Sequence, residues 1–315
     1  MNIYETVKLL EQFDNVLLLT HVRPDGDTIG CAAALCQALR DMGKTAFLLY
    51  NEGITSTYER YAAPYWAPEE FVPGHVVSVD IATLGLLPEN AQPYAQKIEL
   101  AIDHHPSQEF FAPNVCLEAD SAACGEIVYE IVRQLTAITP AIATAIYVAV
   151  STDTGCFQYA NTTPRTHRIA AEVMALVDVA DINKALFRSK SITRLKMEAW
   201  MVSHMELYDD DRVVVMQIPI GLRASMRATE ADIEELSALA PQVQGTDCGI
   251  TLREMKGGRI KVSVRSGPRV DACAVCRKVG GGGHFAAAGA TVEGTLTEVK
   301  EKILQAVKEV TETAE

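Results

Sequence analysis

A seven-residue segment that begins at His21, His-Val-Arg-Pro-Asp-Gly-Asp, contains one imidazole and two carboxylates. It follows an apolar run and precedes an Ala- and Leu-rich stretch with helical spacing, so it is expected to be a strand-to-helix turn. Pro24 and Gly26 favour a tight turn. The side chains of His21, Asp25 and Asp27 would then converge. Since the packing of a globular domain does not need these three groups in one turn, they predict a hydrolytic metal centre.

Further ligand candidates follow other apolar segments in the first half of the chain. Asp80 ends one apolar run, and the next run ends in the triplet Asp103-His104-His105. Asp153 ends an apolar helical segment. Because the carboxyl ends of parallel strands meet at the same edge of a sheet, a parallel fold would gather these side chains in one place.

Each of these residues also has a structural interpretation when it is taken alone. Asp80 and Asp103 could cap helices, Asp153 could belong to a turn, and the two histidines could be structural. Their joint occurrence favours a metal site, and several carboxylates with a few histidines suit Mn²⁺ or a similarly hard ion. Four carboxylates in one cleft would repel one another unless cations neutralise them. Two ions about 3.5–4 Å apart would do so, while lowering the pKa of a bridging water and clamping a phosphoryl group.

The spacing of apolar residues up to about residue 180 predicts an α/β fold, in which a parallel sheet has helices on both faces. Continuous Val, Leu and Ile runs alternate there with longer segments of helical periodicity. Strands are expected at 16–20, 45–50, 76–80 and 98–103, and helices at 28–42, 121–135, 140–151 and 166–177. Residues 1–182 are therefore expected to form a catalytic, metal-binding domain.

The remainder of the chain is expected to form a connecting helix and a second domain. The charged segment that continues to about residue 206 lacks Gly and Pro and predicts a connecting helix at 183–210. Residues 211–315 predict a smaller α/β domain with a hairpin turn at Gly257-Gly258. Its strands are expected at 212–219, 247–254 and 259–265, and its helices at 230–238, 271–279 and 296–310.

Composition argues against several classes of protein. No apolar run approaches the roughly 18 residues of a membrane span, and the N-terminus lacks the features of a signal peptide. The formal net charge of -13 argues against a long duplex as partner, because duplex binding depends on many Lys and Arg contacts to phosphates. The eight cysteines are scattered and include one lone C-x-x-C pair, Cys273 and Cys276, so reduced thiols and a cytoplasmic protein are expected.

The order of the four acidic and histidine motifs resembles that of the DHH phosphoesterase superfamily, which is named for the triplet seen here at residues 103–105. The resemblance covers roughly residues 10–180 of the chain. The run Gly280-Gly-Gly-Gly-His284, followed by Phe-Ala-Ala-Ala-Gly, resembles the DHHA1 substrate-binding domain of the same family. Within the family the chain resembles the NrnA-type group, whose members are bifunctional oligoribonucleases that also dephosphorylate 3'-phosphoadenosine-5'-phosphate (pAp).

The resemblance implies two bound Mn²⁺ ions, for which Mg²⁺ or Co²⁺ could substitute, with one carboxylate shared between them. One ion would be held by His21, Asp25 and Asp80. The other would be held by Asp27, Asp80, His104 and Asp153. Asp103 would orient His104 or the adjacent backbone, and His105 would stabilise charge on the phosphoryl oxygens.

The resemblance also implies a substrate-binding role for the second domain. Arg265 and His284 would bind the terminal nucleotide of the substrate. Gly281, Gly282 and Gly283 would form a loop whose backbone N–H groups face an anion. The second domain would thus hold the end of a short substrate while the first domain performs the chemistry.

The chain departs from the family pattern at two positions. Cys31 stands where the family commonly has Ser, and Gln108 stands where Asn often follows the triplet. Neither residue is a metal ligand in this assignment, so the departures concern the positioning of substrate and not the chemistry.

The implied activity is hydrolysis of short oligoribonucleotides (nanoRNA) to nucleoside monophosphates and of pAp to AMP and phosphate. The expected partners are short single-stranded RNA, dinucleotides and pAp, without a membrane or a long duplex, and the family often forms homodimers. Two alternatives remain open: a phosphodiesterase of linear dinucleotides such as pApA from cyclic di-AMP turnover, and a non-catalytic nucleotide-binding protein. A family II inorganic pyrophosphatase is disfavoured because its Ser-Arg-Lys phosphate clamp is not visible in the second domain.

Overall fold

The computed structural model describes residues 1–233 and 236–314 and forms two compact units, Met1–Ser189 and Lys190–Glu315. The connecting segment expected at 183–210 is not one helix. It contains the end of α7 (Val179–Asn183), a π-helical turn η4 (Lys184–Arg188), α8 (Ile192–Ser203) and the short strand β6 (Glu206–Tyr208). Helix propensity alone therefore did not reveal the interruption before α8, where Ser191 caps the new helix by accepting a hydrogen bond from the backbone N–H of Arg194.

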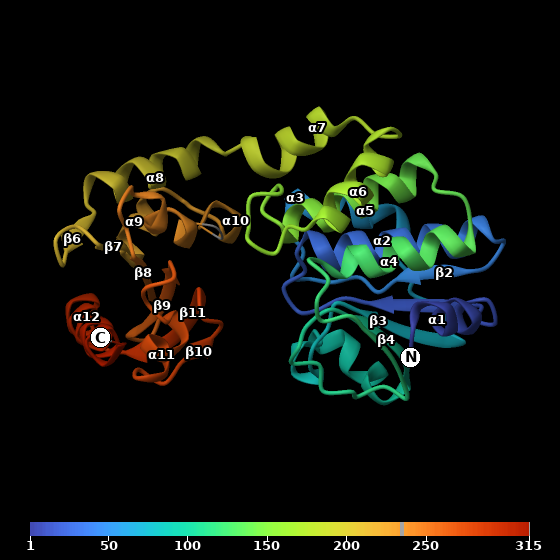
Figure 1. Ribbon diagram of the computed structural model, residues 1–315, viewed down its shortest axis with the longest axis horizontal. Coiled ribbons are helices and arrows are strands. Elements are labelled where there is room, and N and C mark those ends of the chain that lie inside the picture. Colours follow the sequence, from blue (N-terminus) through green and yellow to red (C-terminus); the bar gives the residue numbers. More distant parts are fainter. Residues whose placement is uncertain (234–235, 315) are drawn as a thin grey trace. The chain divides into compact units, whose positions relative to one another are not determined.

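The first unit is built on a five-stranded parallel sheet with the strand order β2-β1-β3-β4-β5 (Figure 1). Its strands are β1 (Val16–Leu19), β2 (Ala46–Leu48), β3 (His75–Val79), β4 (Ile98–Asp103) and β5 (Asn114–Leu117). Its α-helices are α1 (Ile3–Leu10), α2 (Gly26–Asp41), α3 (Ser56–Ala62), α4 (Cys124–Leu135), α5 (Pro140–Asp153), α6 (Pro164–Met174) and α7. Its 3-10 helices are η1 (Ala63–Tyr65), η2 (Leu84–Leu86) and η3 (Glu89–Lys97). The predicted α/β class with a parallel sheet is confirmed.

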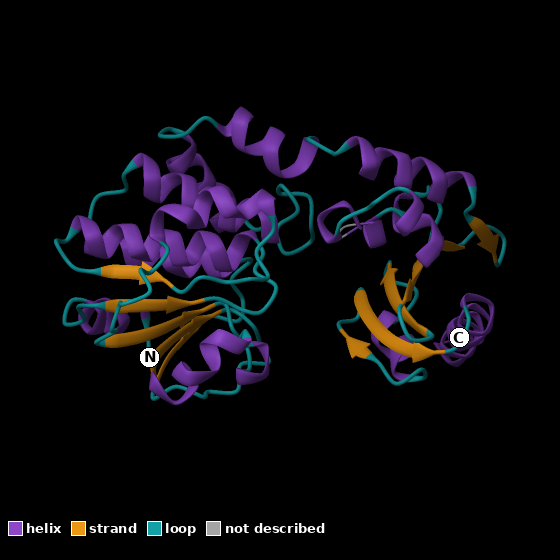
Figure 2. Ribbon diagram, turned by 180° about the vertical axis from the view of Figure 1, so that it is seen from behind, coloured by secondary structure: helices purple, strands orange, loops and turns teal. Residues whose placement is uncertain are grey.

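Helices cover both faces of this sheet (Figure 2). Helices α2, α4 and α5 pack on one face, where Leu18, Val77 and Ile102 join their core. On the other face, Leu17 and Val76 belong to a second core that includes Ala91 of η3. The predicted helices on both faces are confirmed, and the helix η3 on the second face is a 3-10 helix. Burial on both faces explains why these strands are continuous apolar runs.

The site residues follow the carboxyl ends of three neighbouring strands, β1, β3 and β4. These strands are parallel, and their register pairs Leu19 with Ser78 and Val79 with Ile102. The chain leaves each strand at the same edge of the sheet, so the segments that follow β1, β3 and β4 begin close together. This edge is where ligands of open α/β sheets gather.

Close packing of α2 against α5 brings two further carboxylates to this edge. A Cβ atom on Gly26 would lie 2.3 Å from the Oγ1 of Thr152, and one on Gly30 would lie 2.4 Å from the carbonyl oxygen of Ala145. The predicted role of Gly26 in a tight turn is thus refined: it is the first residue of α2, and it allows the close approach of α5.

The second unit contains a six-stranded mixed sheet with the order β10-β11-β9-β8-β7-β6 (Figure 1). Its strands are β6, β7 (Val213–Ile218), β8 (Cys248–Met255), β9 (Arg259–Ser266), β10 (Gly282–Gly283) and β11 (Ala287–Glu293). Its helices are α8, α9 (Ile220–Ser225), α10 (Glu230–Ile233), α11 (Ala272–Arg277), α12 (Leu296–Ala314), η5 (Leu236–Ala238) and η6 (Ala240–Gln242). The smaller α/β domain predicted after residue 211 has the expected class of fold.

The hairpin turn expected at Gly257-Gly258 joins β8 to β9 and is confirmed. Both glycines have positive φ values, 78° and 67°, as a tight hairpin turn requires. The glycine run was expected to be a loop, but Gly282 and Gly283 form the edge strand β10, which pairs with β11. The sequence Ala-Ala-Gly-Ala-Thr-Val-Glu of β11 has few residues that favour strands, which is why neither strand was expected.

All eight cysteines are free thiols, and all except Cys156 are buried. Cys273 and Cys276 lie in the core of the second unit, in agreement with a packing role for this pair. Within residues 1–233 and 236–314, no helix has the length and apolar composition that a membrane span needs.

Candidate metal centre

A first ligand group, His21, Asp25 and Asp80, lies at the carboxyl ends of β1 and β3. The Nε2 of His21 is 3.6 Å from the Oδ1 of Asp25 and 3.8 Å from the Oδ2 of Asp80. Asp25 is also the N-cap of α2, since its Oδ1 accepts hydrogen bonds from the backbone N–H groups of Asp27 and Thr28. The helix cap fixes the Asp25 carboxylate beside His21, as the tight turn predicted.

A second ligand group consists of Asp27, His104 and Asp153. The Nε2 of His104 is 3.9 Å from the Oδ2 of Asp27 and 3.7 Å from the Oδ2 of Asp153. These residues come from the first turn of α2, the end of β4 and the last residue of α5. Each group can converge on a point between its members, as ligands of a cation do.

Asp80 belongs to the first group and also lies next to His104 of the second group. Its Oδ2 faces the ring of His21, and its Oδ1 is 3.5 Å from the Nε2 of His104. The residue is 3% exposed and has a φ of 59°, in a left-handed conformation that Asp tolerates better than most side chains. Among the described residues its Oδ1 has no hydrogen-bond partner. A buried carboxylate oxygen needs a compensating partner, and a cation on each side of Asp80 would provide one.

The ring of His104 is held in the orientation that a metal ligand needs. Its Nδ1 lies 3.1 Å from the carbonyl oxygen of Ser121, which can only accept a hydrogen bond. The proton therefore resides on Nδ1, and the lone pair of Nε2 points at the carboxylates. No residue type along the chain signals this carbonyl group in advance.

Asp103 supports His105 rather than the ring of His104. Its Oδ1 accepts hydrogen bonds from the Nδ1 of His105 at 2.7 Å and from the backbone N–H groups of His104 and His105. Its Oδ2 accepts from the Nε2 of Gln108 at 2.6 Å, and the same amide donates to the carbonyl oxygen of Ile81. Gln108, one of the two departures from the family pattern, is thus a buried support of Asp103.

His105 lies close to Asp80, one of the ligand candidates, but the Nδ1 of its ring is already hydrogen-bonded to Asp103. Its Nδ1 is 3.5 Å from the Oδ1 of Asp80, farther than from Asp103. The hydrogen bond with Asp103 raises the pKa of His105, although burial opposes this shift. The shift extends the pH range in which the ring is an imidazolium, and in that form its Nε2–H would be a donor toward an anion.

Without cations, burial and mutual repulsion destabilise the ionised forms of Asp27 and Asp80. Burial raises the pKa of Asp27 well above its usual range, and the charges of Asp153 and Asp25 raise it further. Burial also raises the pKa of Asp80, with added repulsion from Asp27 and Asp25. Divalent cations would relieve both the burial penalty and the repulsion. The donor set of oxygens with two imidazoles suits a hard or borderline divalent ion.

Two backbone N–H groups at the start of α4 hold Asp27 in place. The N–H of Cys124 donates to its Oδ2 at 2.7 Å, and the N–H of Gly125 donates to its Oδ1 at 2.9 Å. A Cβ on Gly125 would lie 2.6 Å from that of Ala149, so only glycine allows this approach. The thiol of Cys31, the other departure from the family pattern, also donates to Asp27 at 3.4 Å. Sequence reasoning missed these contacts to Asp27.

The raised pKa values predict an inverted pH dependence of stability in the metal-free protein. Folded-state pKa values above those of the unfolded chain mean that the native state binds protons more tightly, so this contribution to stability is lost as pH rises. We expect the unfolding temperature in EDTA to fall from about pH 5 to about pH 8. With excess Mn²⁺ it should rise over the same interval, because cations bind the ionised carboxylates.

Thermal unfolding followed by fluorescence in EDTA and in Mn²⁺ measures this difference. The Asp80→Asn variant, which lacks one of the buried charges, should show a shallower decline in EDTA than the wild-type protein. Parallel pH trends in EDTA and in Mn²⁺ would contradict the assignment of these carboxylates to a metal centre.

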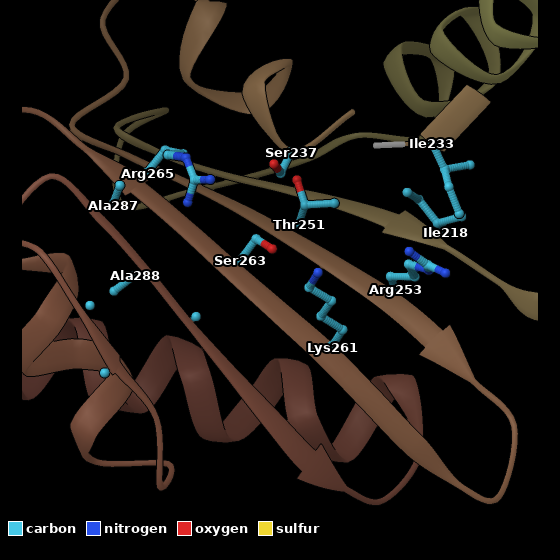
Figure 3. Close-up of a pocket in the computed structure, with 13 residues that line it drawn as sticks. Ile218, Ile233, Ser237, Thr251, Arg253, Lys261, Ser263, Arg265, Ala287 and Ala288 are labelled. Carbon is cyan, nitrogen blue, oxygen red and sulfur yellow. The ribbon is translucent and has the colours of Figure 1, made fainter. Parts of the chain in front are cut away.

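In the second unit, Arg265, Gly282 and Gly283 line one pocket of about 340 Å³ on a face of the sheet (Figure 3). Gly281 and His284 are not among its lining residues. The N–H of Gly281 instead donates to the carbonyl oxygen of Cys276 and closes the end of α11, so it does not face an anion. His284 is exposed, and its N–H donates to Ala287 within the β10–β11 hairpin.

Comparisons with known proteins agree with this architecture. The DHH family, N-terminal domain, matches residues 15–150, and the DHHA1 domain matches residues 210–313. The chain is 32% identical over 303 residues to a Thermus thermophilus protein named bifunctional oligoribonuclease and PAP phosphatase NrnA, covering 93% of this chain and 89% of that protein. A Mycoplasma genitalium protein of the same name is 26% identical over 300 residues, covering 92% of each chain.

A solved structure shares the fold over nearly the whole chain. The crystal structure of an exopolyphosphatase-related protein from Bacteroides fragilis aligns with a TM-score of 0.87 at 22% identity, and the alignment covers 99% of this chain and 96% of that one. The two matched domains, the relative at 32% identity and the His/Asp cluster at the sheet edge lead to the same assignment. The chain belongs to the DHH family of phosphoesterases, and its second unit is a DHHA1 domain.

Proposed function

We propose that this protein is a divalent-metal-dependent phosphoesterase that hydrolyses short oligoribonucleotides to nucleoside monophosphates and pAp to AMP and phosphate. The observation that carries the proposal is Asp80, a buried carboxylate that faces His21 with one oxygen and His104 with the other. The relatives named as oligoribonuclease and PAP phosphatase support this choice of substrates.

The proposed cofactor is a pair of Mn²⁺ ions. His21, Asp25 and Asp80 would hold one ion, and Asp27, Asp80, His104 and Asp153 would hold the other. When bound, the ions would neutralise the carboxylates and supply Lewis acidity toward a phosphoryl oxygen. The chain keeps the lone pair of His104 available through Ser121 and keeps Asp80 buried, which strengthens its interaction with cations.

His105 is proposed to bind the phosphoryl group that undergoes substitution. Asp103 accepts the Nδ1–H of His105 and favours its positive form, so its Nε2–H can donate to an oxygen that gains negative charge in the transition state. The buried amide of Gln108 fixes Asp103 from the other side. The ring is therefore preorganised before substrate arrives.

Arg265 is proposed to bind a phosphate of the substrate outside the reacting centre. It projects from β9 into the pocket of the second unit, beside the β10–β11 hairpin (Figure 3). A guanidinium can donate two parallel hydrogen bonds to one phosphate, which fixes orientation as well as position. The expected product of each cleavage is a nucleoside monophosphate because the substrate is short and held at its end.

Hydrolysis measured in parallel on four substrates tests the proposal. With Mn²⁺, pAp and a 5'-phosphorylated diribonucleotide should be hydrolysed much faster than a long RNA, and pyrophosphate should be left intact. Rapid cleavage of pyrophosphate alone would contradict the proposed substrates. Turnover confined to pApA would favour a dinucleotide phosphodiesterase. Tight Mn²⁺ binding without hydrolysis of any nucleotide would favour a binding protein.

A further inference from the structure

The pocket of the second unit extends along the sheet beyond Arg265. Lys261, Ser263 and Arg265 are alternate residues of β9, so their side chains lie on the same face of the sheet. On the neighbouring strand β8, Thr251 pairs with Ser263 and Arg253 pairs with Lys261. Figure 3 shows Thr251 and Ser263 between Arg265 and Lys261. The result is a row of two hydroxyl groups between two cationic side chains.

The hydroxyl group of Thr251 faces this pocket without a hydrogen-bond partner among residues 1–233 and 236–314. Thr251 is 3% exposed, and among the described residues its Oγ1 forms no hydrogen bond. Buried hydroxyl groups nearly always have a hydrogen-bond partner. A buried hydroxyl group that lines a pocket without such a partner therefore points to a ligand or a water molecule that would form the missing hydrogen bond. Nothing in the packing of the sheet requires a hydroxyl there, because a valine would fill the same space.

The charge of the pocket suits an anion. Its described lining residues include Arg253, Lys261 and Arg265 and no acidic side chain. Arg253 is bound to the two carboxylate oxygens of Glu230 at 2.8 and 2.9 Å, so this cation is committed to an ion pair at its end of the pocket. Lys261 lies opposite Arg253 on the neighbouring strand and next to Ser263 on the same face of β9 (Figure 3).

We propose that Lys261, with the hydroxyl groups of Thr251 and Ser263, forms a second phosphate-binding subsite next to the one at Arg265. Lys261 and Arg265 are four residues apart on β9, which places their Cα atoms roughly 13 Å from each other. Their long side chains can approach two phosphates on either side of one nucleoside. The ammonium group binds one phosphate as a point charge, and the hydroxyl groups orient its oxygens or the adjacent ribose.

The proposal rests on the proposed function, because it takes the occupant of the pocket to be a short oligonucleotide with its first phosphate on Arg265. The second unit would then bind two successive phosphates of the substrate. Ligands with two phosphates separated by a nucleoside should bind more tightly than ligands with one phosphate, and Lys261 should account for the difference.

Equilibrium binding to the full-length protein in EDTA, where hydrolysis cannot occur, tests the subsite with AMP and pApA as probes. Lys261→Met should weaken pApA binding about tenfold, as expected for the loss of a charge-assisted hydrogen bond, and change AMP binding less than about threefold. Thr251→Val should weaken pApA binding by a few-fold. Lys256→Met, which removes an exposed cation from the turn of the same hairpin, should change neither.

Equal weakening of both probes by Lys261→Met, or no effect on either, would overturn the subsite, and so would a wild-type protein that binds neither probe. The unfolding temperature of each variant shows whether the fold is retained, and Lys261→Gln provides a second substitution at the same site. If the wild-type protein hydrolyses no nucleotide with Mn²⁺ but binds pApA in the Lys261-dependent manner, the proposed activity fails while the subsite stands. Hydrolysis without Lys261-dependent binding would support the activity and overturn the subsite.

Discussion

Replacement of Asp80 by alanine is expected to lower kcat with saturating Mn²⁺ by roughly 10³-fold or more on every substrate that the wild-type protein hydrolyses. Asp80 is the residue through which the two ligand groups meet, with its oxygens directed at His21 and His104. Without it each of the two proposed ions would lose a ligand, and the remaining carboxylates would bind both ions less tightly. Initial rates and Mn²⁺ titration of the same preparation measure both losses.

Two controls separate this loss from unfolding. In EDTA the Asp80→Ala variant should unfold at the same or a higher temperature than the wild-type protein, because a buried carboxyl group with an orphan oxygen has been removed. Asp120→Ala, which removes an exposed carboxylate from the same unit, should leave both rate and metal binding unchanged. An Asp80→Ala protein with nearly wild-type turnover would contradict the metal assignment.

Replacement of His105 by glutamine is expected to lower kcat about 10²- to 10³-fold while the affinity for Mn²⁺ changes little. The Nδ1–H of His105 is hydrogen-bonded to Asp103, and His105 is not one of the proposed metal ligands. Its replacement therefore removes stabilisation of the transition state without removing a ligand. The loss should grow as the pH falls through the raised pKa of His105, because the wild-type ring becomes charged below that pH. Steady-state kinetics and Mn²⁺ titration across a pH series measure these effects.

The corresponding control is His75→Gln. His75 is paired with Glu99 and stacked on Phe13 in the same unit, away from the ligand groups, so its replacement should leave kcat unchanged. Asp103→Asn should reproduce much of the His105→Gln effect, and the double variant should be little worse than either single one, because the two residues act as a unit. If His105→Gln abolishes Mn²⁺ binding, then His105 is a ligand, as its distance from Asp80 would allow.

The positions of the candidate ligands follow from chain features that are visible in the sequence. Buried parallel strands must be apolar, so a carboxylate or imidazole directly after such a run marks the carboxyl edge of the sheet. Asp80 after β3 and the triplet after β4 are placed in this way. The turn after β1 is predicted by its glycine and proline and by the helical spacing that follows it.

Contacts made by backbone groups and by edge strands could not be predicted in the same way. The carbonyl group that orients His104 and the N–H groups that hold Asp27 carry no residue signature. The partner of Asp103 depends on local geometry, because His104 and His105 are both within reach of it. Strand β10 consists of two glycines, whose pairing is set by the hairpin and not by strand propensity.

The location of Mn²⁺ in crystals of the protein tests the central claim most directly. Anomalous scattering from crystals grown with Mn²⁺ should show two peaks, one among His21, Asp25 and Asp80 and one among Asp27, His104 and Asp153, with a carboxylate oxygen of Asp80 next to each. Peaks at other residues, or a single ion that leaves Asp80 uncoordinated, would contradict the two-metal centre.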